Sequence, residues 1–386
     1  MFDINQLFSP LSWAEFISEY FEKKHLLISR NDPHYYDEVV TLEDVDEVIF
    51  SQKINHPAFR VVDSKTGEFP DPRRYTQNGT SSINPVEFCR EYTEGGTLAL
   101  AGMQHHVRSL RAFCNNLQRA YGHPTQTNLY LTPQDAQGFS PHYDNHDVIV
   151  LQIHGKKHWR LYESDMNLPD KSMPFQKEGF TPGKVFKEFD LNAGDLLYIP
   201  RGLVHDAITT DESSLHVTLG VLGYTWSQLL IESVVKLTEE NKEFRHFVSE
   251  GMRSTDYDQH FKTLLSKLEE DLRERNGISR FSKQLEEQTP SENVGHLLNL
   301  IDSSSNQGPE EFAIIEGVSL EENGEAISFK KGFKEVSFPI FCKNTCEELV
   351  THGERFSRSH LDKELDDEGV DVMISRLLRE GIIKRV

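Results

Sequence analysis

Apolar residues in the N-terminal part of the chain recur at the three- to four-residue spacing of amphipathic helices. Trp13–Phe21 predicts a helix that Ser12 would cap, and Thr41–Asp44 resembles the capping box of a second helix. A third helix is expected over Val107–Tyr121, because its apolar side chains share one face: Leu110, Phe113, Cys114, Leu117 and Tyr121. Residues 56–82 are polar with glycine and proline, which predicts a long loop or irregular hairpin that could contact a substrate.

From about residue 127 the pattern changes to short β-rich runs separated by turns. Tight turns are marked by Gly194-Asp195 and Pro200-Arg201-Gly202. The runs, which follow an earlier strand at Leu26–Ile28, are Thr127–Thr132, Val148–Ile153, His158–Tyr162, Val185–Asp190, Asp195–Ile199 and Leu215–Val221. Many short antiparallel strands predict a closed sandwich or barrel, of which the jelly roll or cupin is one type.

After Trp226 the β pattern stops and helical spacing returns. An amphipathic stripe that could bury a core, a dimer interface or both consists of Phe261, Leu264, Leu265, Leu268 and Leu272. Residues 303–309 read as a linker. The last segment predicts a helix at Ser359–Leu365, a helix at Val370–Glu380 and a strand at Ile382–Val386, an order that resembles a winged-helix unit.

These changes divide the chain into four predicted parts. They are an N-terminal helix and strand region at 1–93, a β core at 94–226, a helical region at 227–302 and a winged-helix-like domain at 310–386. The expected fold class is therefore a mainly β core with a helical region and a second small domain after it.

Composition limits the partners and the compartment. The 386 residues carry a net charge of −21, which argues against nonspecific DNA binding but is compatible with a basic protein or peptide partner. Solubility alone would explain the charge equally well. Four cysteines do not make a disulfide framework, and the spacing of Cys342 and Cys346 favours buried or incidental thiols over a metal site. Without an apolar run of membrane length or a secretory signal, a cytoplasmic protein is expected.

The most informative chemistry lies in His142, Asp144 and His205. His142 and Asp144 flank one residue, so on an extended strand both side chains point to the same face. His205 follows a Gly-Asp turn and an apolar strand, which is what a jelly roll requires to bring distant residues together. Two imidazoles and one carboxylate are the ligand set of non-haem Fe(II) oxygenases, although the same set could hold Zn²⁺ or Mn²⁺.

Lys157 favours Fe(II) among these metals. It stands two residues after Gly155, where a strand leaving the metal site would return across the pocket, and could pair with an acidic cosubstrate such as 2-oxoglutarate. On composition alone a solvated strand residue would be the preferred interpretation of Lys157, because Lys156-Lys157-His158 is a polar run. Asn128 and Tyr130 alternate on an adjacent predicted strand, so they share a face and either could hydrogen-bond a bound carboxylate.

Other histidines crowd these motifs. His216 is expected to be a second-layer or core residue rather than a ligand. His146, His154 and His158 are expected to be surface or packing residues, because three ligands already satisfy the site.

Taken together, these residues resemble the JmjC-type ribosomal oxygenases, a branch of the cupin-fold 2-oxoglutarate oxygenases. The resemblance is most specific from about 94 to 226 and looser elsewhere. The segments that carry it, in order, are Asn128–Pro133, Gln137–Asp144, Leu151–Arg160, Gly194–Gly202 and Ser214–Leu219. The resemblance implies a JmjC double-stranded β-helix (jelly roll), a helical dimerisation region that would make the protein a homodimer, and a C-terminal winged helix.

The resemblance also implies roles for single residues. His142, Asp144 and His205 would bind Fe(II), while Lys157 would pair with the distal carboxylate of 2-oxoglutarate and Asn128 would assist. Some members of the family carry a serine near the cosubstrate where this chain has Gly220. The implied reaction uses O2 to hydroxylate a His or Arg side chain of a ribosomal protein.

Two other functions stay open from the sequence. The same chemistry could act on a biosynthetic peptide or a free amino acid, although the helical and winged-helix parts favour a macromolecule. The second alternative is a noncatalytic metal-binding module that recruits a partner. The complete set of His142, Asp144 and His205, together with Lys157, argues against it. Histone demethylation is known among JmjC proteins, but no chromatin-reading motif or basic tract supports it here.

Overall fold

The computed structural model describes residues 2–248, 254–273, 296–297, 301, 311–315, 317–331, 334–351, 353, 355–358, 361 and 365–386. The chain forms two compact units, Met1–Leu230 and Ile231–Val386. Among the helices in the described part of the chain, none is long and apolar enough to cross a membrane.

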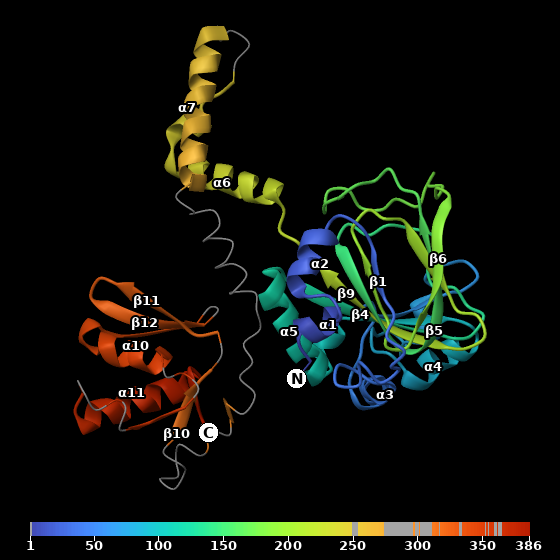
Figure 1. Ribbon diagram of the computed structural model, residues 1–386, viewed down its shortest axis with the longest axis horizontal. Helices are drawn as coiled ribbons and strands as arrows, with labels where there is room; N and C mark the ends of the chain where they lie inside the picture. Colours follow the sequence, from blue (N-terminus) through green and yellow to red (C-terminus); the bar gives the residue numbers. More distant parts are fainter. Residues whose placement is uncertain are drawn as a thin grey trace. The chain divides into compact units, whose positions relative to one another are not determined.

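The first unit is built around a nine-stranded antiparallel sheet that folds over on itself (Figure 1). Seven strands follow the order β1-β7-β5-β9-β4-β3-β2, and the remaining two, β6 and β8, pair with the end of β5. The strands are β1 (Leu26–Ile28), β2 (Phe59–Val62), β3 (Thr97–Ala101), β4 (Thr125–Thr132), β5 (Asp147–Tyr162), β6 (Val185–Asn192), β7 (Leu196–Ile199), β8 (His205–Ile208) and β9 (Ser214–Val221).

Strand β5 belongs to both layers of this barrel. Its first half pairs with β7 and β9, and its second half pairs with β6 and β8. The strand turns between layers at Gly155, whose φ is +62° and where a Cβ atom would lie 1.9 Å from the Ser213 carbonyl oxygen. Only glycine fits there. The two strands predicted at Val148–Ile153 and His158–Tyr162 are therefore one strand with a bend.

The prediction of a loop over residues 56–82 is wrong for Phe59–Val62, which form edge strand β2 beside β3. Phe59 and Val61 are buried in the core, whereas Arg60 points to the other face of the sheet. A run of four residues with a central arginine is too short to show the alternation of a strand.

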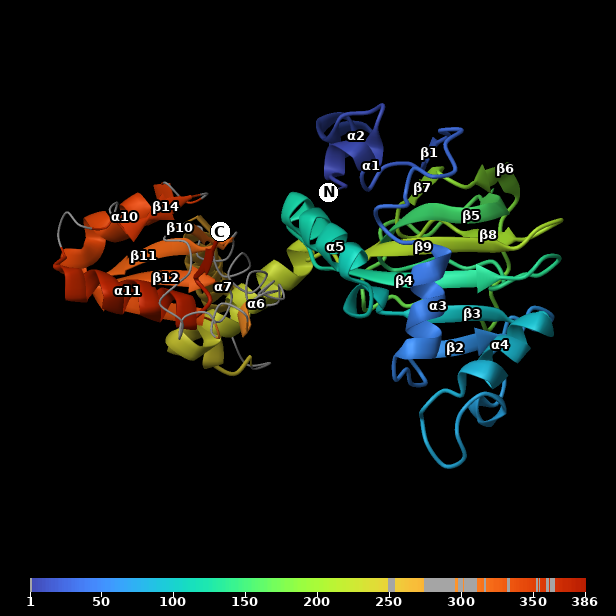
Figure 2. The ribbon, with the colours of Figure 1, turned by 90° about the horizontal axis from the view of Figure 1, so that it is seen from below.

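Helices cover the outer face of the larger layer (Figure 2). Side chains of α3 such as Val48 and of α5 such as Leu117 share one core with Leu98 of β3, Leu129 of β4 and Ile149 of β5. The helices are α1 (Ile4–Phe8), α2 (Trp13–Glu19), α3 (Leu42–Ser51), α4 (Pro85–Thr93) and α5 (Arg108–Tyr121), with short 3-10 turns at Pro72–Arg74 and Met103–His105. Burial of this outer face leaves the inner face of the sheet to line a cavity.

Local sequence explains where two of these helices begin. The Ser12 hydroxyl accepts a hydrogen bond from the Glu15 amide, and the Glu15 carboxylate accepts one from the Ser12 amide. Thr41 and Asp44 form the same reciprocal pair at the start of α3. Each box satisfies two backbone donors that a helix start would otherwise leave free, so both predicted helix starts are confirmed.

Helical structure follows the barrel, with α6 (Trp226–Glu240), a 3-10 turn (Lys242–Arg245) and α7 (Ser254–Arg273). Lys236 of α6 binds the buried carboxylate of Asp271 on α7, with 3.0 Å between Nζ and Oδ1. In the predicted stripe of α7, Phe261 and Leu265 stay about half exposed. A dimerisation role for this region stays a prediction.

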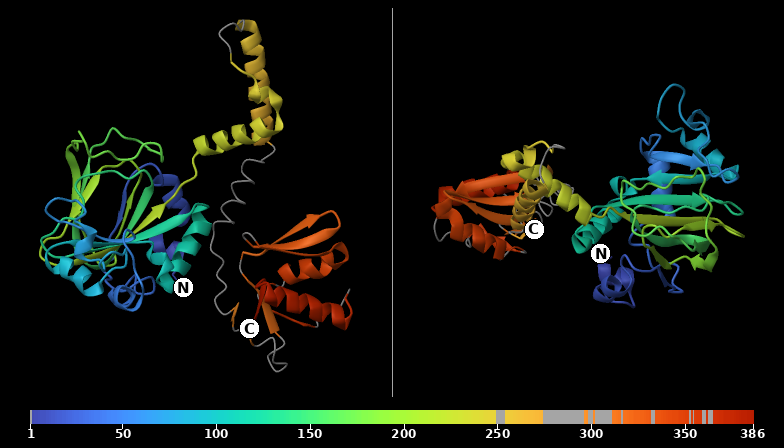
Figure 3. Two further views of the ribbon diagram at one scale, coloured as in Figure 1. Left: turned by 180° about the vertical axis from the view of Figure 1, so that it is seen from behind. Right: turned by 90° about the horizontal axis from the view of Figure 1, so that it is seen from above.

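The C-terminal segment has strands and helices of its own (Figure 3). Their apolar side chains pack into a separate core. Helix α11 confirms the helix predicted at Val370–Glu380, and β15 confirms the strand after it. The helix predicted at Ser359–Leu365 and the linker at 303–309 lie outside the described residues, except for Leu361 and Leu365, which are in bends. The elements are β10 (Glu311–Ile314), β11 (Ser319–Asn323), β12 (Ala326–Lys331), β13 (Lys334–Pro339), a 3-10 turn (Ile340–Cys342), α10 (Lys343–Thr351), β14 (Phe356–Ser357), α11 (Asp367–Arg379) and β15 (Ile383–Arg385).

Strands here form two three-stranded sheets, ordered β14-β10-β15 and β11-β12-β13. Cys342 and Cys346 are buried in this core, as the sequence indicated. The winged-helix assignment stays a prediction.

Candidate active site

The inner faces of the barrel enclose a cavity of about 310 Å³. Both layers contribute polar residues, because inward positions alternate along each strand. Asn128 and Tyr130 of β4 lie opposite Thr218 and His216 of β9, in register across the sheet. The cavity is lined by Arg60, Thr97, Asn128, Tyr130, Gly138, Phe139, His142, Asp144, Val148, Lys157, Trp159, His205, Asp206, Ala207, His216 and Thr218. All six site residues predicted from the sequence are among them.

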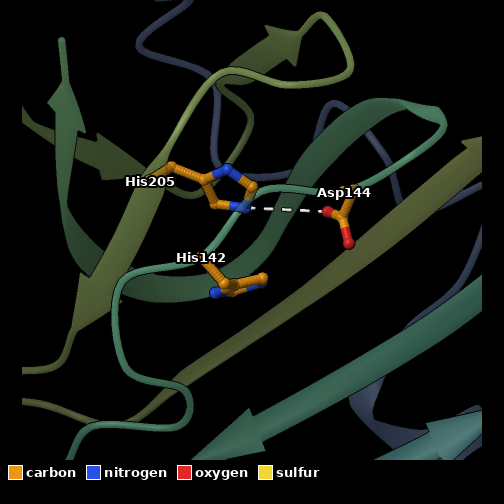
Figure 4. A group of neighbouring side chains, drawn as sticks. All are labelled: His142, Asp144 and His205. Carbon is orange, nitrogen blue, oxygen red and sulfur yellow. Dashed lines mark ion pairs between the residues drawn. The ribbon is translucent and has the colours of Figure 1, made fainter. Parts of the chain in front are cut away.

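His142, Asp144 and His205 converge at one point of this cavity, and we call them the ligand triad (Figure 4). One potential ligand atom from each lies within 4.8 Å of the others. The two histidines are joined through their backbones: the His205 amide donates to the His142 carbonyl at 2.9 Å, and the His142 amide donates back at 3.1 Å. This antiparallel bridge fixes two side chains that are distant in the sequence.

Each imidazole is oriented by its own backbone. His142 Nδ1 donates to the Ser140 carbonyl at 2.8 Å, and His205 Nδ1 donates to the Leu203 carbonyl at 3.0 Å. With Nδ1 protonated, the lone pair of a neutral ring lies on Nε2, which is the atom left for a metal. Burial lowers the pKa of His205 to about 4, helped by the neighbouring His142 ring, so His205 is neutral at pH 7.

Asp144 supplies the anionic member of the triad. The backbone carbonyl of Asp144 accepts a hydrogen bond from the Gly202 amide, which anchors Asp144 beside the turn that leads to His205. The carboxylate Oδ2 lies 3.7 Å from His205 Nε2. Because that imidazole is neutral, the contact is not an ion pair. Two imidazole nitrogens and one carboxylate facing a common point are a donor set that fits a divalent transition metal.

Lys157 lies just past the bend of β5 and is 3% exposed. Its Nζ donates to the Thr132 hydroxyl at 2.9 Å. Burial lowers the pKa of Lys157 to about 7, because no anion in the described structure compensates for the lost hydration. A buried lysine of this kind is suited to bind an acidic ligand.

Two further buried nitrogens have no hydrogen-bond partner. They are Trp159 Nε1, which is a donor, and His216 Nδ1, which donates or accepts according to the tautomer of its ring, and both residues line the cavity. Leaving such groups unpaired costs about 1–3 kcal/mol each. Together with Thr132, these residues form a polar corner, here called the lysine cluster (Lys157, Thr132, Trp159 and His216). Lys157 is the member of this cluster that fits an acidic cosubstrate, because it is buried without an anionic partner in the described structure.

The sequence analysis did not identify Thr132 and Trp159 as neighbours of the site. Thr132 continues the alternation of Asn128 and Tyr130 by one step, and Trp159 follows Lys157 by the same step, so period-two counting could have found both. His216 was expected to be second-layer or core; its ring lines the cavity and stacks on Tyr130, with 5.1 Å between ring centroids.

Gly220 also has a structural neighbour. A Cβ atom at this position would lie 2.8 Å from Cδ2 and 2.9 Å from Nε2 of His146. The imidazole of His146 therefore occupies the space that a side chain at 220 would need. His146 is partly buried, in agreement with the packing role expected for it.

The family comparison agrees with the geometry. Residues 103–229 match the model of the JmjC domain. The chain is similar to proteins named "Bifunctional lysine-specific demethylase and histidyl-hydroxylase NO66". The one from Dictyostelium discoideum is 35% identical over 232 residues, which are 58% of this chain and 44% of that protein. The one from Drosophila melanogaster is 31% identical over 233 residues, 59% of this chain and 35% of that protein. The chain thus spans less than half the length of these curated relatives.

Solved structures show the same fold. The Escherichia coli ribosomal oxygenase YcfD is similar over 97% of this chain and 98% of its own, with a TM-score of 0.55 and 14% identity. A YcfD structure in complex with cobalt and 2-oxoglutarate gives a TM-score of 0.52 at 13% identity. The expected cupin core with added helices is therefore confirmed.

Proposed function

We propose that this chain, whose residues 103–229 match the JmjC domain, is an Fe(II)- and 2-oxoglutarate-dependent oxygenase that hydroxylates a side chain of a ribosomal protein. One observation carries the proposal: the ligand triad and the buried Lys157 open into the same cavity. A metal site alone would not need the lysine, and a solvated lysine would not be buried there.

The described residues divide between metal and cosubstrate. His142, Asp144 and His205 would hold Fe(II), and Lys157 would pair with the distal carboxylate of 2-oxoglutarate, flanked by Asn128 and Tyr130. When bound, Fe(II), 2-oxoglutarate and O2 would supply the oxidising power that places one oxygen atom in an unactivated C–H bond.

The protein's own contribution is preorganisation and exclusion of water. The backbone bridge and the two Nδ1 hydrogen bonds fix the ligand atoms before anything binds, so little reordering is needed. Lys157 would acquire a proton as its pKa rises beside a carboxylate. The apolar wall of Val148 and Trp159 would keep bulk water from the reacting atoms.

Histidine is the favoured target residue and arginine the second. The support is that the sequence relatives are named histidyl-hydroxylases and that YcfD is named a ribosomal oxygenase. The net charge of −21 suits a basic ribosomal segment. The relatives are also named lysine demethylases, so methyl-lysine peptides belong in any substrate panel.

The test is mass spectrometry of ribosomal proteins from cells with and without this gene. A gain of one oxygen atom on one protein is expected in wild-type cells. It should vanish on deletion and return with a plasmid carrying the wild-type chain, but not with Asp144→Ala. An unmodified ribosome in wild-type cells would move the search to other peptides or small molecules, which is the alternative substrate class.

Turnover of 2-oxoglutarate without substrate separates the enzyme from a noncatalytic metal-binding module. The purified chain with Fe(II) should form succinate slowly under air, whereas a binding module should form none.

A further inference from the structure

Arg60 lines the same cavity, and neither metal binding by the triad nor cosubstrate binding by Lys157 gives it a role. It lies on edge strand β2, in register with Ala99 of β3, which in turn pairs with Tyr130 of β4. Its strand neighbours Phe59 and Val61 are buried in the outer core. Arg60 therefore belongs to the inner face of the sheet, in the row that continues to Tyr130, and it lines the same cavity as the triad.

The guanidinium of Arg60 is held by an aromatic ring and not by an acid. Its Cζ lies 4.5 Å from the centroid of the Phe69 ring, in the geometry of a cation–π contact. Phe69, which is half exposed, comes from the loop after β2 and also contacts Phe139, at 6.3 Å between centroids. Phe139 contacts Tyr130 and His142, so the aromatic surface runs from Phe69 to the triad.

The other charged groups that line the cavity are already assigned. Asp206 is paired with Arg160, Asp144 belongs to the triad, and Lys157 is bonded to Thr132. In the part of the chain that the structure describes, Arg60 makes no ion pair with a carboxylate. An arginine stacked on a ring keeps its five N–H donors in a planar fork, which matches a carboxylate through two parallel hydrogen bonds.

We propose that Arg60, supported by Phe69, binds a carboxylate of the substrate next to the side chain that is hydroxylated. The inference rests on the proposed function and adds a specificity to it: within a basic segment, one acidic group sets the register of the target residue in the cavity. That carboxylate belongs either to an Asp or Glu side chain or to the free C-terminus of the substrate.

The test uses the full chain with Fe(II), 2-oxoglutarate and two libraries of short synthetic peptides. The libraries have a central histidine or a central arginine, randomised flanks, and C-termini that are free or amidated. Products that gain one oxygen atom are sequenced by mass spectrometry. For the wild-type chain, one flanking position should favour Asp and Glu over Asn and Gln about tenfold, or free termini should be favoured over amidated ones.

Charge reversal makes the test independent of a simple loss of folding. Arg60→Glu should move the preference at that same position from acidic to basic residues, or from free to amidated termini. Arg108→Glu is the matched control, since Arg108 is an exposed residue at the start of α5 and brings the same change of charge. Its preference should match the wild type.

Three outcomes would overturn the proposal. Products without an acidic preference, or with the same preference in wild type and Arg60→Glu, would show that Arg60 reads no carboxylate. A change in the KM for 2-oxoglutarate with unchanged peptide selection would assign Arg60 to the cosubstrate. No product from any peptide, with succinate still formed, would overturn peptide hydroxylation itself and this inference with it.

Discussion

The ligand triad and the lysine cluster share one cavity but differ in how complete they are. In the triad, both Nδ1 atoms have hydrogen-bond acceptors and only the atoms that face the metal position are left open. In the lysine cluster, Trp159 Nε1 and His216 Nδ1 have no hydrogen-bond partner, and the partner of Lys157 is the Thr132 hydroxyl. The difference indicates that the candidate metal position is built in advance, whereas Lys157 still lacks an anionic partner in the described structure.

The largest effect is expected from removing the anionic ligand of the triad. Asp144→Ala should reduce succinate formation to background, because two neutral imidazoles alone hold a divalent metal weakly. Asp46→Ala, on the exposed face of α3, is the control and should keep wild-type turnover. Iron content measured after gel filtration should fall together with activity. Near wild-type succinate formation by Asp144→Ala would sink the assignment of the metal site.

Lys157→Met tests the lysine cluster, and it should weaken the binding of 2-oxoglutarate. Loss of a charged hydrogen-bond donor should raise the KM for 2-oxoglutarate about 10- to 100-fold. Without cosubstrate the same variant should melt at the same temperature as wild type or higher, because a buried amine with one partner is costly. The control Lys156→Met removes a partly exposed neighbour that pairs with Asp211. Equal KM values for the two variants would contradict the role of Lys157.

The depressed pKa of Lys157, about 7, sets a pH dependence. Above that pH the amine of the free protein is neutral, so binding a carboxylate requires uptake of a proton. The affinity for 2-oxoglutarate should be nearly constant below about pH 7 and fall by up to about tenfold per pH unit above it. Calorimetry in buffers of different ionisation enthalpy would measure the proton uptake, and uptake independent of pH would speak against it.

The same shift has the opposite effect on folding in the absence of cosubstrate. Between about pH 7 and the ordinary lysine pKa of about 10.4, the unfolded chain binds more protons than the folded one. The contribution of Lys157 to the free energy of unfolding therefore increases with pH across this window. Urea titrations of wild type and Lys157→Met should diverge toward lower pH.

Trp159→Phe tests a prediction with a smaller expected effect, that the unpaired indole N–H of Trp159 contributes to the binding of 2-oxoglutarate. The substitution removes the N–H together with part of the bicyclic ring, so the KM for 2-oxoglutarate should rise about 2- to 10-fold. The smaller buried ring should also lower stability without cosubstrate, whereas the N–H itself has no partner to lose. A loss of stability with unchanged KM would assign the indole of Trp159 to the fold alone.

Much of the candidate site could be predicted because the residue types that bind a metal follow a strict chemistry. The spacing of His142 and Asp144 and the later His205 were recognisable without knowing which strands pair. Arg60 was not, because its strand is four residues long and its inward direction depends on β3 lying beside it. The continuity of β5 was also hidden, since Gly155 reads as a turn between strands and only the close Ser213 carbonyl shows why the strand continues through it.

The bridge between His142 and His205 has a consequence for dynamics. Each of the two amides is held by the carbonyl of the other residue, so neither can exchange its hydrogen with solvent unless the pair separates. Their exchange rates in heavy water should therefore be equal and should slow together when a metal ties the two rings. The same opening of the bridge would then be detected at both amides, and its rate would set an upper limit on the rate at which a bound metal is released.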